Sequence, residues 1–335
     1  MQEARHYIRY EDGRAGCRLC PNKCLLDEGV RGVCMARKNV LGRLVSENYG
    51  RITGLHLDPV EKKPLFHFFP GQAVLSAGSF GCNFRCGWCQ NRNISQAGIE
   101  NFPMMKAITA NSLAEKAIES GSIGLAYTYN EPLVWFEFMV DTAVRVKEAG
   151  KKNIMVSNGY ILPEPLKELL EITHAFNIDL KSFSPLFYEK LCGGSLDSVK
   201  DCLLSIARSD AHLEVTFLPI PGLNDDLSLF KEMIQWMAGE LGAHIPLHIS
   251  RYFPWHFSQQ PPTSVSLLKY MHEIACEFLH YVYLGNVAGG AEMSATRCHY
   301  CGKLLADRRV YTTTLYAVTA SGHCSQCGEQ VFVME

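Results

Sequence analysis

The chain has 335 residues, of which 47% are hydrophobic and 20% are charged, and this suits one barrel-sized domain with small appendages. A formal net charge of −2 gives no reason to expect a nucleic acid or an anionic membrane as a partner. No apolar run approaches the ~20 residues that span a bilayer, and the first residues lack the apolar core of a signal peptide.

Eleven of the fourteen cysteines fall into three tightly spaced groups, which is typical of metal sites. Without an export signal we expect a reducing cytoplasm, where disulfide bonds are rare. The other three cysteines stand alone. Cys202 and Cys276 lie in expected helices and are interpreted as core residues, whereas Cys192 is a candidate for a radical or hydrogen-donor role.

The first group has the spacing C-x2-C-x3-C-x9-C and consists of Cys17, Cys20, Cys24 and Cys34. Zinc and an auxiliary iron–sulfur cluster both take four thiolates, so both remain open. We favour structural zinc, and a disulfide pair fits the expected compartment less well.

A segment with a charged centre follows at residues 55–71. Residues 61–63, Glu-Lys-Lys, are interpreted as a solvated turn between two apolar strands. The aromatic residues 66–69 are expected to pack the segment onto the main domain. His56 and His67 are interpreted as structural histidines.

The second group, Cys82, Cys86 and Cys89, has the spacing C-x3-C-x2-C and follows a predicted buried strand at 74–79. Three thiolates can hold three irons of a four-iron cluster and leave the fourth iron open for a substrate. A closed zinc site fits poorly, because it requires four ligands. The cluster would lie at the carboxyl end of a strand, where barrel enzymes keep their chemistry.

Strands and helices alternate after the cluster. Repeated units of this kind predict a parallel sheet covered by helices, and the pattern alone does not separate a partial barrel from a doubly wound sheet. The expected strands are 123–128, 153–157, 175–180, 213–218, 245–250 and 281–284. The expected helices are 112–121, 132–149, 164–171, one after Ser184, 196–208, 226–238 and 264–279. Ser112 is the expected N-cap of the first helix, and Asn224 or Asp225 that of the helix at 226–238.

The third group lies near the end of the chain. Two C-x2-C-G motifs, 22 residues apart, are typical of a zinc ribbon and contain Cys298, Cys301, Cys324 and Cys327. We predict three domains: residues 1–70 with the first cysteine group and lead-in strands, residues 71–290 with the repeated strand–helix units, and residues 291–335 with the ribbon.

The motif at residues 82–89, with Trp88 before its last cysteine, resembles the signature of the radical SAM superfamily. The first cysteine group, Asp-Pro-Val-Glu-Lys-Lys-Pro-Leu at 58–65 and Cys-Gln-Asn at 89–91 resemble one family more closely. It is the radical SAM member of the AmmeMemoRadiSam system, which is related to pyruvate formate-lyase activating enzymes. The resemblance covers essentially the whole chain.

The resemblance implies a partial (β/α)6 barrel, a [4Fe–4S] cluster and S-adenosylmethionine (SAM). In the family the open iron binds SAM, and an electron cleaves SAM to methionine and a 5′-deoxyadenosyl radical that abstracts hydrogen. It further implies a reductant such as flavodoxin or ferredoxin, and companions of the Memo-like and AMMECR types. The oxygen sensitivity of such a cluster implies anaerobic or microaerobic life.

The resemblance also implies roles for polar residues at the ends of the strands. Those assigned to SAM are Trp88, Asn130, Glu131, Ser157, Asn158 and Asp179. Lys181, Arg251 and Cys192 are the candidates for catalysis or for holding the substrate, Arg251 because its fork suits an anionic group. His248 is interpreted as a buried, hydrogen-bonded histidine. Val156 stands where related enzymes have an aspartate that helps to bind a cation, so we expect no cation site.

Three functions remain open from the sequence. The first is a radical enzyme that acts on a small molecule together with the companion proteins. The second is an activase that makes a glycyl radical on a protein, although the ferredoxin-like insert of many activases is missing after residue 89. The third is a zinc protein that binds partners and performs no chemistry.

Overall fold

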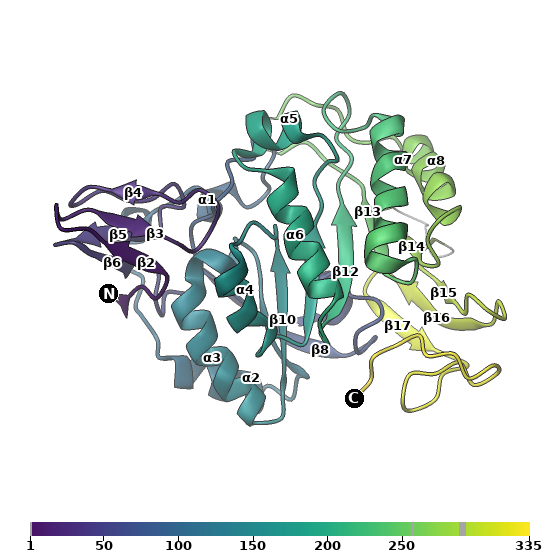
Figure 1. Cartoon of the computed structure of the whole chain (residues 1–335). Helices are drawn as coiled ribbons and strands as arrows, with labels where there is room; N and C mark the ends of the chain where they lie inside the picture. The colour runs from purple at the N-terminus through teal and green to yellow at the C-terminus, as the bar shows by residue number, and fades with distance from the viewer. Residues whose placement is uncertain (1, 256–257, 288–292) are drawn as a thin grey trace.

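The computed structural model describes residues 2–255, 258–287 and 293–335 (Figure 1). Its centre is an eight-stranded sheet in the order β14-β13-β12-β11-β10-β9-β8-β7. Strands β8 to β14 are parallel, and β7 pairs with β8 in the antiparallel direction. The strands are β7 (Gly54–Pro59), β8 (Ala73–Gly78), β9 (Gly124–Tyr127), β10 (Lys152–Ser157), β11 (Ala175–Asp179), β12 (His212–Phe217), β13 (Leu247–Ser250) and β14 (Val282–Gly285).

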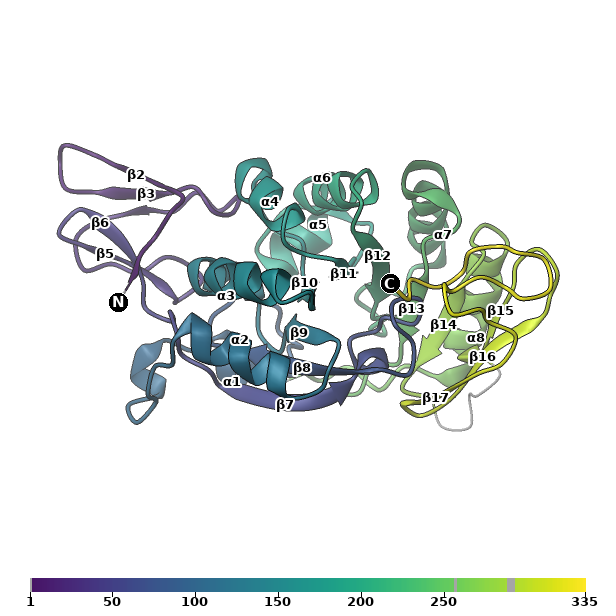
Figure 2. The same cartoon turned by 90° about the horizontal axis from the view of Figure 1, so that it is seen from below.

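A helix lies between each consecutive pair of parallel strands. These helices are α2 (Ala110–Glu119), α3 (Phe136–Glu148), α4 (Pro163–Leu170), α6 (Leu196–Ala207), α7 (Leu227–Trp236) and α8 (Val265–Cys276), with short α1 (Arg92–Ser95) and α5 (Pro185–Phe187). The strand order never reverses, whereas a doubly wound sheet has a switch point where it does. The fold is therefore the partial barrel, and Figure 2 shows its strands one after another beside the helices.

Side-chain chemistry explains most of these elements. All four residues of β9 are buried, as expected for a parallel strand covered on both faces. Ser184 caps α5 and Pro185 takes its first position, as predicted. Two predicted caps are wrong. Thr109 caps α2, and its hydroxyl accepts from the Ser112 N–H, whereas Asp226 caps α7.

Small sheets flank the barrel at both ends of the chain (Figure 1). The N-terminal ones are β1-β6-β5 and β2-β3-β4, and the C-terminal one is β15-β16-β17. Their strands are β1 (Gln2–Glu3), β2 (Tyr7–Arg9), β3 (Ala15–Cys17), β4 (Leu25–Leu26), β5 (Arg37–Val40), β6 (Arg43–Ser46), β15 (Thr296–Arg297), β16 (Leu304–Arg309) and β17 (Thr312–Leu315). The predicted boundary at residue 290 lies outside the described residues, and the one at residue 70 stays a prediction.

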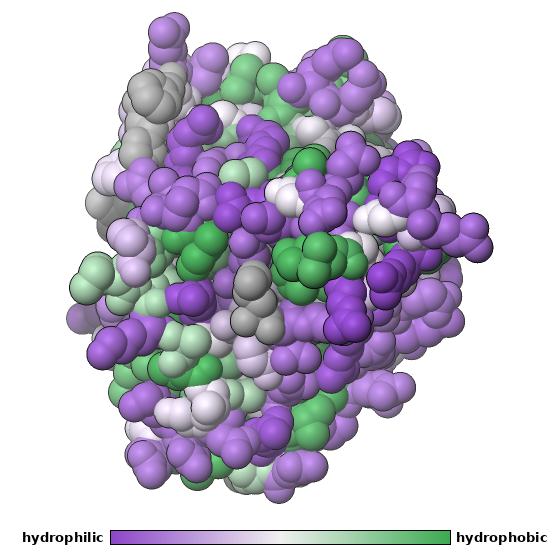
Figure 3. Space-filling model, turned by 90° about the vertical axis from the view of Figure 1, so that its left-hand side faces the viewer, coloured by the Kyte–Doolittle hydropathy of each residue, from purple (hydrophilic) through white to green (hydrophobic). Residues whose placement is uncertain are grey.

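The face on the side of the N-terminal sheets is mostly hydrophilic, with apolar side chains scattered over it (Figure 3). Among the described residues, no helix is both long enough and apolar enough to cross a bilayer. Of the isolated cysteines, Cys202 is buried as predicted, but the interpretation of Cys276 as a core residue is wrong because it is exposed at the end of α8.

The charged segment at residues 61–63 is not the solvated turn that we predicted. Glu61 and Lys63 are each only 2% exposed. Lys63 forms a buried ion pair with Asp58, at 2.7 Å between Nζ and Oδ2, and Glu61 accepts from the Gly71 N–H at 2.6 Å. Glu61 and Lys63 are therefore part of the packed interior, whereas Lys62 between them is exposed. The segment follows β7, which joins the central sheet.

A buried carboxylate on β12 fastens the same segment to the barrel. Glu214 accepts from the backbone N–H groups of Phe66 at 3.0 Å and His67 at 2.7 Å. It also accepts from the Nε2 atoms of His212 at 2.9 Å and His248 at 2.6 Å. His248 is thus the buried, hydrogen-bonded histidine that we predicted. Residues 66–69 pack onto the barrel as expected, with Phe66 and Phe68 in the core.

His67 joins the end of the chain to the barrel. Its ring nitrogens bond the Val331 carbonyl at 2.8 Å and the Tyr283 hydroxyl at 2.5 Å. The structural interpretation of His67 is therefore confirmed. Residues 66 and 67 connect β12, the edge strand β14 and Val331 near the end of the chain.

We predict that Glu214→Gln lowers the free energy of unfolding by about 3 kcal/mol, because a side-chain amide then faces buried donors that need an acceptor. Urea unfolding measures this. Exposed Glu232 on α7 offers the matched control, and Glu232→Gln is expected to change stability by less than about 0.5 kcal/mol. Equal effects of the two variants would contradict the role of Glu214.

The effect should also depend on pH. Burial raises the pKa of Glu214, but hydrogen bonds from His212 and His248 outweigh it and hold the pKa well below its ordinary value. This contribution to stability is present above the unfolded pKa of about 4.3 and is lost as the pH falls through the folded pKa. The difference between the variant and the parent should therefore persist at pH 7 and shrink only in acid.

Candidate active site

The loop after β8 carries the three-cysteine group and is tightly held. At Gly81 the backbone has φ +93°, and a Cβ there would lie 2.5 Å from the Cys34 carbonyl oxygen. Asn83 is fully buried and donates to the Tyr160 carbonyl at 2.7 Å. Asn130 accepts from the Ser79 N–H at 2.9 Å and donates to the Gly81 carbonyl at 3.0 Å. The loop thus has one defined path at the mouth of the barrel.

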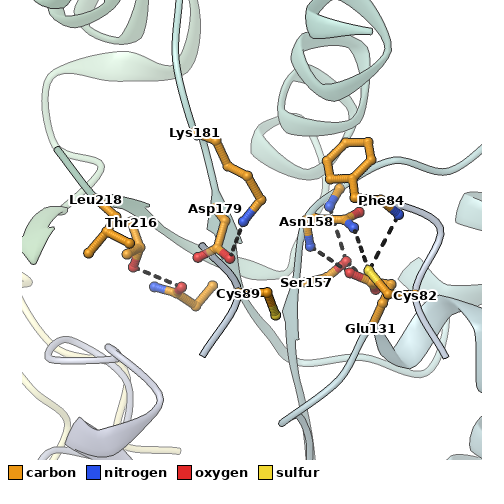
Figure 4. Close-up of polar contacts among 12 residues, drawn as sticks. Cys82, Phe84, Cys89, Glu131, Ser157, Asn158, Asp179, Lys181, Thr216 and Leu218 are labelled. Atoms are coloured by element: carbon orange, nitrogen blue, oxygen red, sulfur yellow. Dashed lines mark hydrogen bonds and ion pairs between the residues drawn. The ribbon is translucent and has the colours of Figure 1, made fainter. Parts of the chain in front are cut away.

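The three thiols of this loop lie among hydrogen-bond donors. The Cys82 sulfur accepts from the Phe84 N–H at 3.4 Å and from Asn158 Nδ2 at 3.8 Å (Figure 4). The Cys89 sulfur lies 3.3 Å from the Ser95 hydroxyl. Burial raises the pKa of Cys82 well above its ordinary value, so a bound cation is needed to stabilise its thiolate. This donor set fits an iron–sulfur cluster with three protein ligands.

Cys192 lies beside the second of these thiols. It is fully buried, and its carbonyl accepts from the Arg85 N–H at 2.7 Å. A hydrogen bond from the Cys192 thiol lowers the pKa of Cys86. The structure thus brings Cys192, on the segment after α5, next to a cluster ligand from the loop after β8.

Glu131 joins the ends of β9 and β10. Its carboxylate accepts from the Leu133 N–H at 3.0 Å, the Ser157 hydroxyl at 2.8 Å and the Asn158 N–H at 2.8 Å (Figure 4). Burial raises the pKa of Glu131 to about 7, against these hydrogen bonds. The carboxylate has about four lone-pair sites, and three donors leave room for one more.

Asp179 and Lys181, at the end of β11, form an ion pair with 2.8 Å between Oδ2 and Nζ (Figure 4). Burial opposes protonation of Lys181, but the Asp179 carboxylate outweighs it, and the pKa of Lys181 lies well above its ordinary value. Lys181 is therefore protonated at neutral pH.

A cavity of about 740 Å³ opens at the carboxyl ends of β11 to β14. Trp88, Asp179 and Lys181 line it, as residues predicted for the site. Arg251 is not among its lining residues. Instead its Nε donates to the Thr263 carbonyl at 2.8 Å, and its guanidinium lies 4.7 Å from the centre of the Phe253 ring.

Sequence reasoning missed most of the cavity wall. The missed residues include Lys62, Gln90, Thr216, His248 and residues 308–311, which are the end of β16 and the turn to β17. The motif at 58–65 could have indicated that Lys62 belongs to the site, but its charged residues were interpreted as a solvent-exposed turn. The sequence did not indicate that residues 308–311 line the cavity, because their position depends on how the C-terminal sheet packs against β14.

The last cysteine group is compact. Among the residues that the structure describes, Cys298, Cys301, Cys324 and Cys327 form the one group of potential metal ligands whose atoms all lie within 4.8 Å of one another. The Cys298–Cys327 and Cys301–Cys324 sulfur pairs are 3.4 and 3.6 Å apart. Four thiols at this spacing fit a single tetrahedral ion.

Neither nearby histidine is part of this group. The His299 ring stacks on that of His280, with 3.5 Å between the centres, and His323 bonds the Ser321 hydroxyl at 3.1 Å. The thiols of the N-terminal group are arranged differently and line a small cavity with Arg37.

Comparison with known proteins agrees with this geometry. The family model described as the radical SAM superfamily matches residues 78–236. An uncharacterized protein of Methanocaldococcus jannaschii is 39% identical over 337 residues, which cover all of both chains. The pyruvate formate-lyase 1-activating enzyme of Escherichia coli K12 is 23% identical over 156 residues, which are 44% of this chain and 61% of that enzyme.

Solved structures share the fold at low identity. Streptococcus suis SuiB bound to S-adenosylmethionine gives a TM-score of 0.51 at 12% identity, over 63% of this chain and 49% of that one. A radical SAM methyltransferase from Sphaerobacter thermophilus gives 0.50 at 14% identity, over 71% of each chain. The narrower assignment to the AmmeMemoRadiSam system stays a prediction. The cysteine loop, the partial barrel and these relatives together place the chain in the radical SAM superfamily, whose members use a [4Fe–4S] cluster and SAM.

Proposed function

We propose that this protein is a radical SAM enzyme that abstracts a hydrogen atom from a small anionic substrate bound at the mouth of the barrel. The cavity carries this proposal. Trp88 and Gln90, on either side of Cys89, line it together with Asp179 and Lys181. A ligand in the cavity would therefore lie next to the cluster loop.

Residues at the strand ends would prepare the site. Cys82, Cys86 and Cys89 would hold the cluster. When bound, the cluster and SAM supply a 5′-deoxyadenosyl radical. Glu131 positions Asn158 and has one lone-pair site left for the SAM ammonium group. That cation would also favour the ionised form of this carboxylate.

The cavity favours a negatively charged substrate. Its lining includes four basic side chains, Lys62, Lys181, Arg308 and Arg309, against the two acidic side chains Glu61 and Asp179. A volume of about 740 Å³ falls within the range of about 300–1,000 Å³ that is common for small-molecule sites. Lys181 is the best-placed residue to hold a carboxylate or phosphate, since Asp179 keeps it protonated.

The proposal includes partners that the chain itself does not contain. An external reductant such as flavodoxin or ferredoxin would supply one electron per cleavage in a reducing cytoplasm. The Memo-like and AMMECR-type companions would supply the substrate or consume the product. Cys192 remains a proposed hydrogen donor, supported by its contact with Cys86. Arg251 does not line the cavity, and we propose for it only a role in binding an anion outside the cavity.

A glycyl-radical activase is the second candidate. The similarity to the pyruvate formate-lyase 1-activating enzyme supports it. The turn at 308–311 argues against it, because this turn forms part of the cavity wall, where an activase would have to admit a loop of a protein substrate.

One anaerobic experiment separates these functions from a zinc protein without chemistry. The chain is reconstituted with iron and sulfide, reduced with dithionite and supplied with SAM. Formation of 5′-deoxyadenosine by a brown protein supports the enzyme, whereas a colourless protein that cleaves no SAM rules it out. A long-lived radical on an added protein would favour the activase, and a new metabolite would favour the small-molecule enzyme.

Cys86→Ala is expected to reduce SAM cleavage to the background level, because two thiolates cannot replace three in fixing the cluster. Chromatography of 5′-deoxyadenosine measures this. Exposed Cys276 gives the control, and Cys276→Ala should keep full activity. Normal cleavage by the Cys86 variant would show that the cluster ligands are assigned wrongly.

Glu131→Gln is expected to raise the Kd for SAM by at least about tenfold, or 1.4 kcal/mol, because its amide N–H₂ opposes one of the three donors around it. Calorimetry on the reconstituted protein measures this Kd. Glu148→Gln, at the exposed end of α3, is the control. An unchanged Kd in a folded Glu131 variant would remove this residue from the proposed site.

We further propose zinc at the C-terminal cysteines. Replacing Cys301 and Cys327 by alanine should remove about one zinc per chain. It should also open the chain to trypsin at Arg308, which is buried in the parent, because the ion fixes the sheet that carries this residue. Elemental analysis and limited proteolysis check both effects. Full zinc content in the double variant would place the ion elsewhere.

A further inference from the structure

We infer that Cys17, Cys20, Cys24 and Cys34 hold a second iron–sulfur cluster, in place of the structural zinc that the sequence favoured. Three independent features of the N-terminal group carry this inference: the separation of its sulfur atoms, the buried arginine that faces them, and the loop against which they pack. None of them depends on the proposed substrate.

The separation of the sulfur atoms distinguishes the two four-cysteine groups. A zinc ion binds each sulfur at about 2.3 Å, so four ligands around one ion lie within about 4 Å of one another. The C-terminal thiols come close to this condition, because all four sulfur atoms lie within 4.8 Å of one another and two pairs lie at 3.4 and 3.6 Å. In the described chain, neither the N-terminal four nor the three of the loop at 82–89 form a group with all atoms within 4.8 Å. The N-terminal group thus shares the wide spacing of the radical SAM cluster loop.

The N-terminal thiols surround a space. All four line one small cavity, together with Leu19, Leu26 and Val134. Gly32 also lines it, and a Cβ at this position would lie 3.5 Å from the Cys24 sulfur. Irons and sulfides between wider-spaced thiolates would fill such a space, which a single ion would leave partly empty.

A buried cation points into the same cavity. Arg37 is 1% exposed and lines it. Its Nη2 donates to both oxygens of Glu137, at 2.6 and 2.8 Å. Its Nε and Nη1 have no hydrogen-bond partner among the residues that the structure describes. Unpaired donors on a buried guanidinium are costly. Thiolates and sulfides of an anionic cluster are the acceptors that the cavity could offer them.

The site is built against the radical SAM loop. Asn22, between Cys20 and Cys24, donates to the Asn83 carbonyl at 3.0 Å. The Cys34 carbonyl lies 2.5 Å from the position of a Cβ on Gly81. The carbonyl of Leu19 accepts from the Leu162 N–H at 3.1 Å. The two groups of cysteines therefore lie on neighbouring, directly bonded segments.

The decisive variant removes only the first cluster. Full-length protein with Cys82, Cys86 and Cys89 replaced by alanine is reconstituted anaerobically with iron and sulfide. We expect about four irons and about one zinc per chain, visible absorption, and an electron paramagnetic resonance signal after reduction by dithionite. A folded variant with about two zinc ions and no iron would overturn the inference.

The parent protein gives an independent count, in case the triple variant fails to fold. It should hold about eight irons, and added SAM should change only the signal of the cluster with the open iron. About four irons and two zinc ions in the parent would also overturn the inference. Replacing Cys20 and Cys24 by alanine should bring the iron to about four, whereas the matched Cys301 and Cys327 double variant should keep about eight. The count is independent of substrate turnover, so failure of the proposed function leaves it unaffected.

Discussion

The buried carboxylate of Glu131 is the constraint on which the mouth of the barrel depends. It accepts from the start of the helix after β9 and from Ser157 and Asn158 at the end of β10. Asn158 in turn donates to the Cys82 sulfur. Burial raises the pKa of this carboxyl to about 7, so its charge depends on the donors around it. One buried group thereby relates two strand ends to the loop that carries the cluster ligands.

A second buried carboxylate builds the other wall of the cavity. Glu214 fastens the segment at residues 61–69 to β12, and this segment contacts the C-terminal sheet through His67 and Arg308. The cavity forms where these parts meet the carboxyl ends of β11 to β14. The C-terminal cysteine sheet therefore contributes to substrate binding in the proposed function, because residues 308–311 line the cavity.

The three cysteine groups differ in the spacing of their thiols, and we propose that they hold different metals. The C-terminal four are close enough for one ion, whereas the N-terminal four and the three of the loop are spaced more widely. A buried thiolate also needs a nearby positive charge to stabilise it. Arg37 provides a cation at the N-terminal group, and Lys181 lies near Cys86 and Cys192. The surroundings of each group, and not only its spacing in the chain, select what it binds.

The sequence by itself determined the features that depend on neighbours along the chain. The cysteine spacings, the alternation of strands and helices, and the cap at Ser184 involve residues a few positions apart. Only the tertiary structure decided the strand order, the burial of Glu61 and Lys63, and the cavity wall at 308–311. It also placed the caps of α2 and α7 at Thr109 and Asp226, which the sequence analysis did not predict. These features depend on contacts such as that of Phe66 with Glu214, 148 residues apart, and no local pattern encodes which distant partner a charged residue will find.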